Sequence, residues 1–529
     1  MRCRRERGGM RVLVVDIDSL RPDHLGCYGY DRDTAPTVDA IADDGVRFDR
    51  CFVSDSPCLP SRTALATCRH GIETGVVTHF GEGQWYDNPG SGHDPDPERP
   101  LSFQHLAQNG VRTASVSSFT QRHMAYHFSA GFQEAIQPTA ETGLLAVEDG
   151  ADVTDAALTW LDSHATDDDW LLHVNFWDVH HPYQGIEEYV EPVRESGEAA
   201  QWPDDDAIAS QRGVTGTRTA DLWPNPAEYD AEWYEEKYSE WPMPERFEER
   251  ADAEHVIDGY DAAIRKVDAE VQRLLDALET TGVREETAII VTGDHGEALG
   301  EHGIYAEHAM PHPPCQRVPL IVSWPGVTDA RAGESTDGYV YQFDLMATLC
   351  DLFDIEVPAG WDADSFQPAL TEAEFDGREF LVSGHGIYTF GRALYHDDDV
   401  YIRLYHPGVF SLPGEYNDPD LPNDGLELLH DMQADPHLTT NRIAEDTDRA
   451  TEMRAMLDRW LADRMGDDWT DTPQASRGRD PLVQMAGEGP YLYVDPDALV
   501  GLYERLDRPD PQVSRLEWSL DTYLRDESN

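Results

Sequence analysis

Short apolar runs alternate with amphipathic segments along the first 360 residues, and this alternation is the strongest constraint on the fold. Val12–Val15 has the pattern of a buried strand and ends in acidic residues, and Val46–Val53, Trp170–Trp177 and Thr287–Thr292 also have strand character. Ala253–Thr280 places apolar residues at three- and four-residue spacing, which predicts a long helix. The pattern predicts an α/β fold with a mostly parallel sheet sandwiched by helices.

The chain divides into two predicted domains. Residues 10–360 carry the alternating pattern, and within them residues 186–250 are polar and rich in Trp and acids, which predicts an insertion or lid. In residues 361–529 short β-like runs such as Val400–Tyr405 precede an amphipathic helix at Arg449–Arg464. We therefore expect a smaller C-terminal α+β domain with a helical tail.

The charge of the chain is strongly negative. Its 529 residues include 103 Asp and Glu against 40 Lys and Arg, which gives a formal net charge of −63. Such acidity excludes nucleic acid and anionic membranes as favoured partners. A disordered chain is also disfavoured, because 40% of the residues are hydrophobic. The composition favours a salt-rich, halophilic cytoplasm, where a Debye length of about 3 Å at 1 M salt screens the self-repulsion.

The cysteines and the N-terminus agree with a cytoplasmic location. The seven cysteines form no regular framework, as is typical of a reducing compartment. The Arg-rich stretch before Met10 is not followed by a proper apolar core, so it does not predict a signal peptide. No apolar run is long enough to predict a membrane-spanning segment.

Acidic residues gather at the ends of two predicted strands. Asp16 and Asp18 follow the first strand, and Asp294 and His295 follow the strand at Thr287–Thr292. In open α/β sheets ligands bind beyond the carboxyl ends of the strands, so these segments are expected to converge. Buried carboxylates are costly unless a cation neutralises them, and oxygen ligands with a single imidazole favour Ca²⁺ or Mg²⁺ over zinc. The sequence therefore predicts a site for one hard divalent cation.

A third segment carries the pattern Cys-x-Pro-x-Arg from Cys58 to Arg62. The stretch Cys58–Thr67 resembles the signature of type I sulfatases, and the two acidic segments resemble "DDLRxDxLGCYG" and "DHGExLGEHG" of the same family. The resemblance implies an alkaline-phosphatase-like fold and a formylglycine-generating enzyme as a partner during maturation, which would oxidise Cys58 to formylglycine. One hydroxyl of the hydrated aldehyde then attacks sulfur, and the other expels sulfate by collapse to the aldehyde.

The resemblance also implies a set of metal ligands. Asp18, Asp294 and His295 match the residues that hold the cation in the family. Ser19 stands where many members carry a second aspartate. The fourth ligand is therefore left open between Asp16, Ser19 and a water molecule.

Two further residues match catalytic positions of the family. Arg62 matches the arginine that holds the formylglycine. The stretch from Leu171 to Pro182 resembles "FFDPHxPY", and its first histidine, His180, matches the residue that contacts the transferred sulfuryl group. A protonated imidazole there would stabilise negative charge on the departing oxygen.

The two sulfate-binding lysines of typical sulfatases have no counterparts. The chain contains two lysines, Lys237 and Lys266, and neither lies in the matching passages. Because negative charge that develops in the transition state needs cations or N–H donors, Arg122, His123 and His308 are candidate substrate-binding residues in their place.

Three functions remain open at this point. The leading one is hydrolysis of a sulfate ester, with a sulfated sugar or small molecule as substrate. The second is a phosphonate monoester or phosphodiester hydrolase of the same superfamily, and the third is an inactive anion-binding homologue with an unmodified cysteine. The tryptophans of the predicted insertion would either stack on sugar rings or pack the lid; they are Trp202, Trp223, Trp233 and Trp241.

Overall fold

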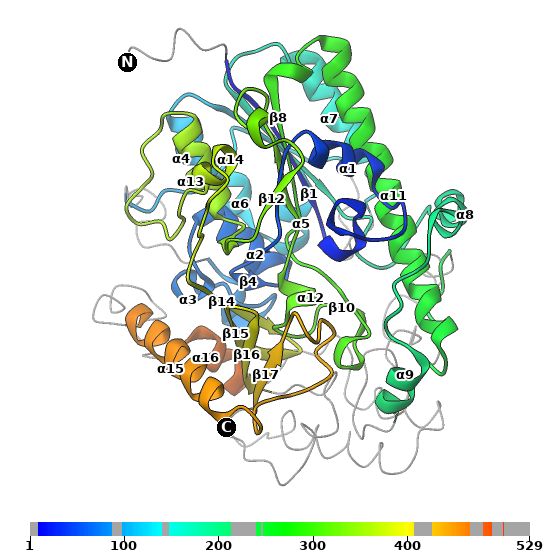
Figure 1. Cartoon of the computed structure of the whole chain (residues 1–529). Helices are drawn as coiled ribbons and strands as arrows, with labels where there is room; N and C mark the ends of the chain where they lie inside the picture. Colours follow the sequence, from blue (N-terminus) through cyan, green and yellow to red (C-terminus); the bar gives the residue numbers. More distant parts are fainter. Residues whose placement is uncertain are drawn as a thin grey trace.

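The structure is a computed structural model of the whole chain (Figure 1). It describes residues 9–86, 98–139, 148–212, 240–244, 247–406, 426–465, 480–488 and 501.

The described residues form an eight-stranded sheet at the centre of the molecule. Its strand order is β12 (Glu334–Thr336), β2 (Val46–Phe48), β11 (Leu320–Ser323), β8 (Thr287–Thr292), β1 (Arg11–Ile17), β7 (Trp170–Phe176), β5 (Arg112–Val116) and β6 (Glu134–Ile136). Of these strands β11 pairs antiparallel with both of its neighbours, and the other pairs are parallel. The predicted mostly parallel α/β sheet is confirmed.

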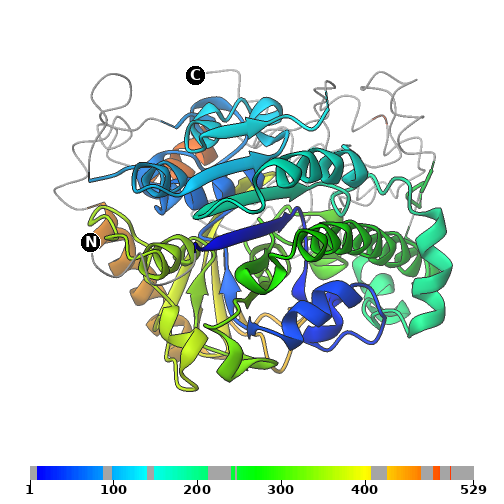
Figure 2. The same ribbon diagram turned by 90° about the horizontal axis from the view of Figure 1, so that it is seen from above.

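Helices cover both faces of this sheet, and the alternation of side chains along β1 decides which helices each residue meets. Leu13 and Val15 pack in one core with α1 (Pro36–Asp43), α7 (Gly150–His164) and α11 (Arg250–Thr281). Val12 and Val14 point the other way, into a core with α2 (Cys58–Thr67), α4 (Ser102–Gln108) and α13 (Asp344–Leu352). Figure 2 shows α7 and α11 side by side on one face of the sheet, where they contact each other.

A second sheet of five described strands is built from both ends of the chain. Its order is β17 (Leu426–Asp431), β16 (Asp399–His406), β15 (Thr389–His396), β14 (Phe380–Ile387) and β4 (Asp55–Ser56). Because Gly384 of β14 pairs with Asp55 of β4, this sheet supports the turn that leads into Cys58. The predicted domain boundary near residue 360 stays a prediction.

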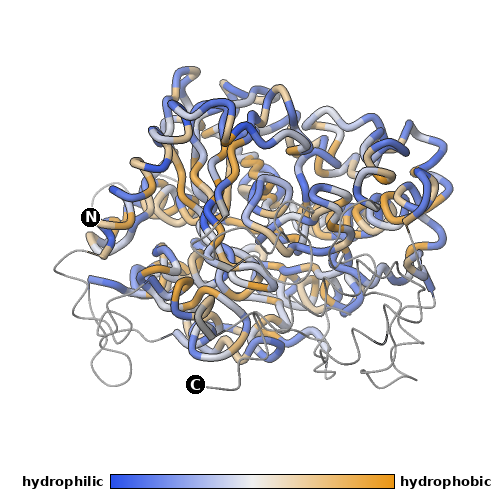
Figure 3. The backbone as a smooth tube through the Cα atoms, turned by 90° about the horizontal axis from the view of Figure 1, so that it is seen from below, coloured by the Kyte–Doolittle hydropathy of each residue, from blue (hydrophilic) through white to orange (hydrophobic). Residues whose placement is uncertain are grey.

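Helices cover this second sheet on its outer side. The helix α15 (Thr447–Arg464) packs Met453 and Leu457 against Val382 and Leu394 of the sheet. The helix α16 (Pro481–Glu488) contacts β14, β15 and β16. The hydropathy colouring of Figure 3 shows the apolar segments inside these layers and hydrophilic segments on the outer turns, which is the pattern of buried cores.

One predicted strand differs from the observed elements. The run Val46–Val53 is divided into β2 of the main sheet and β3 (Cys51–Phe52), which pairs with β13 (Val340–Tyr341) in a separate sheet. The break falls at Asp49, whose N–H donates to the Thr336 carbonyl oxygen as the chain leaves the main sheet.

The insertion contains helices as well as loops. Its helix α8 (Glu187–Ser196) buries Val190 and Val193 and contacts α11, and α9 (Asp205–Arg212) follows. Two of its tryptophans are packed: the Trp202 ring stacks on His437 at 4.6 Å and the Trp241 ring on His255 at 4.3 Å. Trp223 and Trp233 lie outside the described residues.

Within the described part of the chain, no helix has both the length and the apolar composition needed to cross a bilayer. The cysteines of that part are all free thiols; they are Cys27, Cys51, Cys58, Cys68, Cys315 and Cys350.

Candidate active site

The acidic segments converge because β1 and β8 are neighbouring parallel strands. Asp16 of β1 lies opposite Thr292 of β8, so the residues that follow both strands emerge at one edge of the sheet. Candidate ligand atoms of Asp18, Cys58, Asp294 and His295 all lie within 4.8 Å of one another, and all four side chains are buried. The predicted convergence is confirmed, and the role of these residues as metal ligands stays a prediction.

Cys58 begins the helix α2, and its side chain is 1% exposed. Its Sγ lies 3.0 Å from His295 Nε2. Burial raises the pKa of the Cys58 thiol well above its usual value, and the carboxylates of Asp18 and Asp294 raise it further. The unmodified thiol is therefore neutral in this structure, and it is a weaker nucleophile than a thiolate.

Arg62 lies one turn further along α2 and binds three carboxylates. Its Nε donates to Asp16 at 2.9 Å, and its Nη1 donates to Asp18 at 2.8 Å and to Asp294 at 2.6 Å. Burial alone would lower the pKa of Arg62, but Asp16, Asp294 and Asp18 raise it well above its usual value. In the unmodified site the Arg62 guanidinium lies on these carboxylates, and the implied contact of Arg62 with formylglycine stays a prediction.

The charges and the donor atoms fit a divalent cation. One guanidinium faces three carboxylates whose side chains are all 0% exposed, so the cluster keeps an excess of negative charge in a place that water does not reach. Two carboxylates with one imidazole and an oxygen-bearing residue at position 58 would suit Ca²⁺ or Mg²⁺.

The structure separates the candidates for the fourth ligand by their contacts. The Asp16 carboxylate is bound by Arg62 and lies 3.1 Å from His173 Nε2, and Asp16 is absent from the four-residue group. The Ser19 hydroxyl donates to Asp18 Oδ1 at 3.0 Å. The residue that completes the group is Cys58, which the sequence left out of the ligand set.

His180 and His308 lie near each other on the same side of the site. The His180 ring centroid is 5.6 Å from that of His308, whose ring is 4.3 Å from that of His295. Burial lowers the pKa of His180 to about 3, so the free site holds a neutral imidazole where a protonated one was expected. Burial alone would also lower the pKa of His308, but the carboxylates of Glu307 and Glu297 raise it to about 9.

Arg122 and His123 lie on a second wall of the site. The Arg122 guanidinium lies 4.5 Å from the centroid of the Trp177 ring, and its Nε and Nη1 are buried without a hydrogen-bond partner. Candidate ligand atoms of His123, Cys58 and His79 lie within 4.8 Å of one another. The structure therefore brings all three predicted substrate-binding residues, Arg122, His123 and His308, to the surroundings of Cys58.

Sequence reasoning missed two residues of the site. His79 accepts a hydrogen bond from the Leu59 N–H at 3.2 Å and lies 4.7 Å from His123 between ring centroids. No sequence motif around His79 indicates that its side chain lies beside Cys58. Glu297 lies in a quoted motif without a role, yet its carboxylate is buried without a hydrogen-bond partner, 3.6 Å from His308 Nδ1. Burial raises the pKa of Glu297 to about 7.

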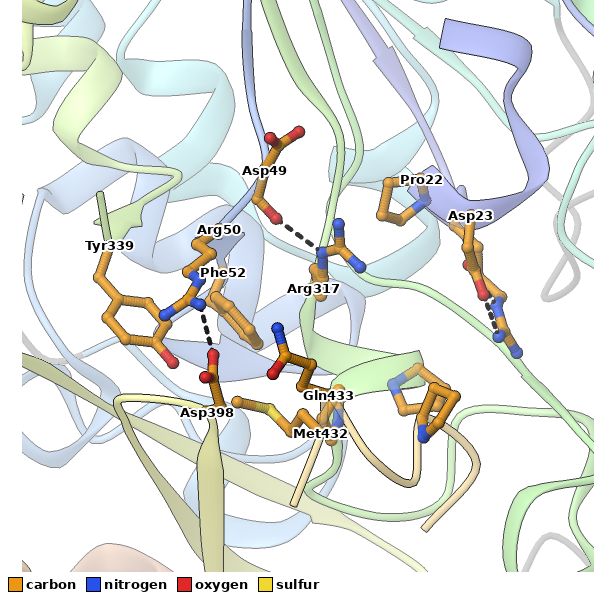
Figure 4. Close-up of a pocket in the computed structure, with 14 residues that line it drawn as sticks. Pro22, Asp23, Asp49, Arg50, Phe52, Arg317, Tyr339, Asp398, Met432 and Gln433 are labelled. Atoms are coloured by element: carbon orange, nitrogen blue, oxygen red, sulfur yellow. Dashed lines mark hydrogen bonds and ion pairs between the residues drawn. The ribbon is translucent and has the colours of Figure 1, made fainter. Parts of the chain in front are cut away.

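A separate pocket of about 320 Å³ lies between the two sheets (Figure 4). None of the predicted site residues lines it. Its arginines already have partners: Arg50 lies 2.5 Å from Asp398 and over the Tyr339 ring, and Arg317 Nε donates to the Asp49 carbonyl oxygen. The group around Cys58, and not this pocket, is the candidate active site.

Comparison with known proteins agrees with this geometry. A model of the family "Sulfatase" matches residues 11–355. The N-acetylglucosamine-6-O-sulfatase of Bacteroides thetaiotaomicron is 22% identical over 505 residues, which cover 84% of this chain and 85% of that protein. Human iduronate 2-sulfatase is 26% identical over 378 residues, 65% of each chain.

Solved structures share the fold. A protein in complex with its substrate D-glucosamine-2-N,6-O-disulfate aligns with a TM-score of 0.65 at 18% identity, over 87% of this chain and 99% of that one. The phosphonate monoester hydrolase of Agrobacterium radiobacter aligns with a TM-score of 0.59 at 19% identity, over 86% and 95%. The family match covers most of the chain and includes the strands that carry the buried site, so the chain belongs to the sulfatase family and is an enzyme of alkaline-phosphatase-like fold.

Proposed function

We propose that this sulfatase hydrolyses the sulfate ester of a sugar, with formylglycine made from Cys58 and one Ca²⁺ or Mg²⁺ ion. The observation that carries the proposal is the buried group of Asp18, Cys58, Asp294 and His295, whose donor atoms lie within 4.8 Å of one another. In this structure the Cys58 Sγ stands where the modified residue would carry its oxygens. A formylglycine-generating enzyme is the partner that this chemistry requires.

The cation would be held by Asp18, Asp294 and His295, and it would lower the pKa of an oxygen on residue 58 and bind a sulfuryl oxygen. The chain's own residues do the remaining work. Arg62 holds the carboxylates of Asp18 and Asp294 in place through its hydrogen bonds to them. His180 is neutral in the free site and its Nδ1 donates to the His181 carbonyl oxygen, so its Nε2 would have to take up a proton before it donates toward the leaving oxygen. His308, held positive between Glu297 and Glu307, would face the anion.

A sulfated sugar is the favoured substrate because of what the similar proteins act on. The relatives include an N-acetylglucosamine-6-O-sulfatase, and one solved structure holds a disulfated glucosamine. The Arg122 guanidinium and the protonated His308, both near Cys58, suit an anionic group. We place this activity in the cytoplasm, as the free thiols and the acidic composition favour.

The second candidate is hydrolysis of a phosphonate monoester or phosphodiester. The fold is shared with a phosphonate monoester hydrolase, and the matched passages contain no lysine. The ratio of kcat/KM for phenyl sulfate and for a matched phenyl phosphonate monoester separates the two. A higher value for the phosphonate monoester would refute the sulfate-ester proposal.

Mass spectrometry of the tryptic peptide Cys51–Arg62 tests the chemistry at residue 58. The expected result is replacement of the CH₂SH side chain by CHO at Cys58, with Cys51 unchanged. The protein should be produced in a host that makes a formylglycine-generating enzyme, and a known sulfatase expressed there serves as the control. An intact thiol at Cys58 beside a converted control would refute the formylglycine proposal and favour the inactive anion-binding alternative.

A further inference from the structure

Large apolar side chains on the surface of the described residues are confined to one place. Those that are exposed are Trp85, Met124 and Tyr126, with exposed fractions of 54%, 57% and 63%. Single exposed apolar residues are ordinary on protein surfaces, but a group of them beside a functional site indicates a ligand surface. All three belong to two short segments, residues 79–86 and 122–127, which also carry His79 and His123.

The two segments lie against each other. The rings of His79 and His123 are 4.7 Å apart between centroids, and the rings of Tyr86 and His127 are 4.9 Å apart. The first contact joins the N-terminal ends of the two segments, and the second contact joins their C-terminal ends. Trp85 is next to Tyr86 in the chain and Tyr126 is next to His127, so these two exposed residues lie at the same end of the pair, while Met124 follows His123.

Both segments are also attached to the helix that begins at Cys58. The Leu59 N–H donates to His79 Nε2 at 3.2 Å, and the Thr63 hydroxyl lies 2.8 Å from His127 Nε2. Leu59 and Thr63 are four residues apart, which is about 6 Å along an α-helix. The exposed residues therefore begin about one helical turn from the residue that would carry the nucleophile.

The side chains along the two segments indicate what shape of ligand would fit there. His79, His123 and Arg122 line the inner end of the two segments near Cys58, where the Arg122 guanidinium would bind an anionic group. Trp85 and Tyr126 offer apolar faces at the outer end, and Met124 stands in the chain between His123 and Tyr126. The group that carries the ester oxygen would lie against these faces. A flat or chair-shaped ring with an apolar face fits such a surface, since aromatic side chains stack on it with little loss of conformational freedom.

We propose that Trp85, Met124 and Tyr126 form a leaving-group subsite that selects sulfate esters of six-membered rings. The inference rests on the proposed sulfatase function and adds the residues that read the leaving group. The ring lies against Trp85 and Tyr126 while its sulfate group reaches past His79 and His123 to residue 58. Either an aryl ring or a pyranose supplies the required face, and the substrates in the test separate them.

The test compares ligands with and without a ring. The variants Trp85→Ala and Tyr126→Ala are assayed with 4-nitrophenyl sulfate and with glucosamine 6-sulfate, and the inhibition constant of inorganic sulfate is measured for each. Loss of an apolar contact in a substrate pocket lowers kcat/KM about 10-fold or more. For both ring-containing esters we therefore expect kcat/KM of the two variants to fall by at least that factor, mainly because KM rises. Trp85→Phe should recover most of the loss. The inhibition constant of sulfate, which has no ring, should stay within about twofold if these residues contact the leaving group alone.

Gln121→Ala is the matched control, because Gln121 is exposed on the same helix as His123 and has no apolar side chain. A larger loss with the aryl ester would assign the subsite to aryl rings, and a larger loss with the sugar would assign it to pyranoses. If both variants behave like Gln121→Ala, or if the sulfate inhibition constant rises in parallel with KM, the subsite is refuted while the sulfatase function stands. If the wild-type protein hydrolyses no sulfate ester, both proposals fail.

Discussion

Replacing Arg62 by Met tests whether a divalent cation and the guanidinium share the same buried carboxylates. Arg62 makes short hydrogen bonds to Asp16, Asp18 and Asp294, and all four side chains are 0% exposed. Methionine removes the positive charge and keeps much of the apolar volume. Breaking a buried ion pair by removal of one partner costs about 3–5 kcal/mol, because the other charge is left uncompensated. We expect a loss of that size in the free energy of unfolding when the metal is removed with EDTA.

Calcium should restore part of this stability. A cation that binds only the folded state at 100 times its Kd contributes about 2.7 kcal/mol. Two like charges about 4 Å apart repel by about 4 kcal/mol at an effective dielectric constant of 20, so Arg62→Met should bind Ca²⁺ at least about tenfold more tightly than the wild type. Urea unfolding in EDTA and over a series of Ca²⁺ concentrations measures both quantities.

Arg392→Met is the matched control. Arg392 is also 0% exposed and makes two 2.7 Å hydrogen bonds to Asp480, and neither residue belongs to the group of candidate cation ligands. It should lose similar stability with no change in the dependence on Ca²⁺. The reasoning is refuted if Arg62→Met is as stable as the wild type in EDTA, or if its Ca²⁺ dependence matches that of Arg392→Met.

Three further predictions follow from other features. Lys266→Met removes the ammonium that lies 2.8 Å from the buried carboxylate of Asp178, and Asp178 stands two residues before His180. We therefore expect about 3 kcal/mol less stability and a lower kcat, and Lys266→Arg should recover part of both. Unchanged urea unfolding would contradict this. Burial raises the pKa of Asp55 to about 7, so the folded state binds a proton more tightly and wild-type stability should fall as pH rises from about 4 to 7. Asp55→Asn should lack that part of the slope, and parallel urea-stability profiles of the two proteins would contradict the assignment. The net charge of −63 predicts that the free energy of unfolding rises between 0.1 and 2 M KCl, as the Debye length shrinks from about 10 Å to below 3 Å; a flat dependence would refute the halophilic interpretation.

The fold class and the main site segments were accessible from the sequence. Apolar residues at strand or helix spacing indicate the local backbone, and Asp18 and Asp294, within two residues after Ile17 and Thr292, mark the ends of two strands. In a parallel sheet such ends share one edge, so Asp18, Asp294 and His295 could be brought together without coordinates. The motif at Cys58 was readable because it is contiguous.

The surroundings of Cys58 depended on the tertiary structure. Cys58 and His295 are 237 positions apart, and Asp55 and Gly384 pair in one sheet from opposite ends of the chain. His79 has no sequence pattern of its own and reaches Cys58 because its ring accepts the Leu59 N–H. The side-chain period of a strand or helix tells which face a residue occupies, but not which residue of another element meets it there. The packing of whole helices and strands decides which residues meet. This packing brings Arg62 to its three carboxylates, and it brings the segments that carry the exposed aromatic residues to Cys58 through His79 and His123.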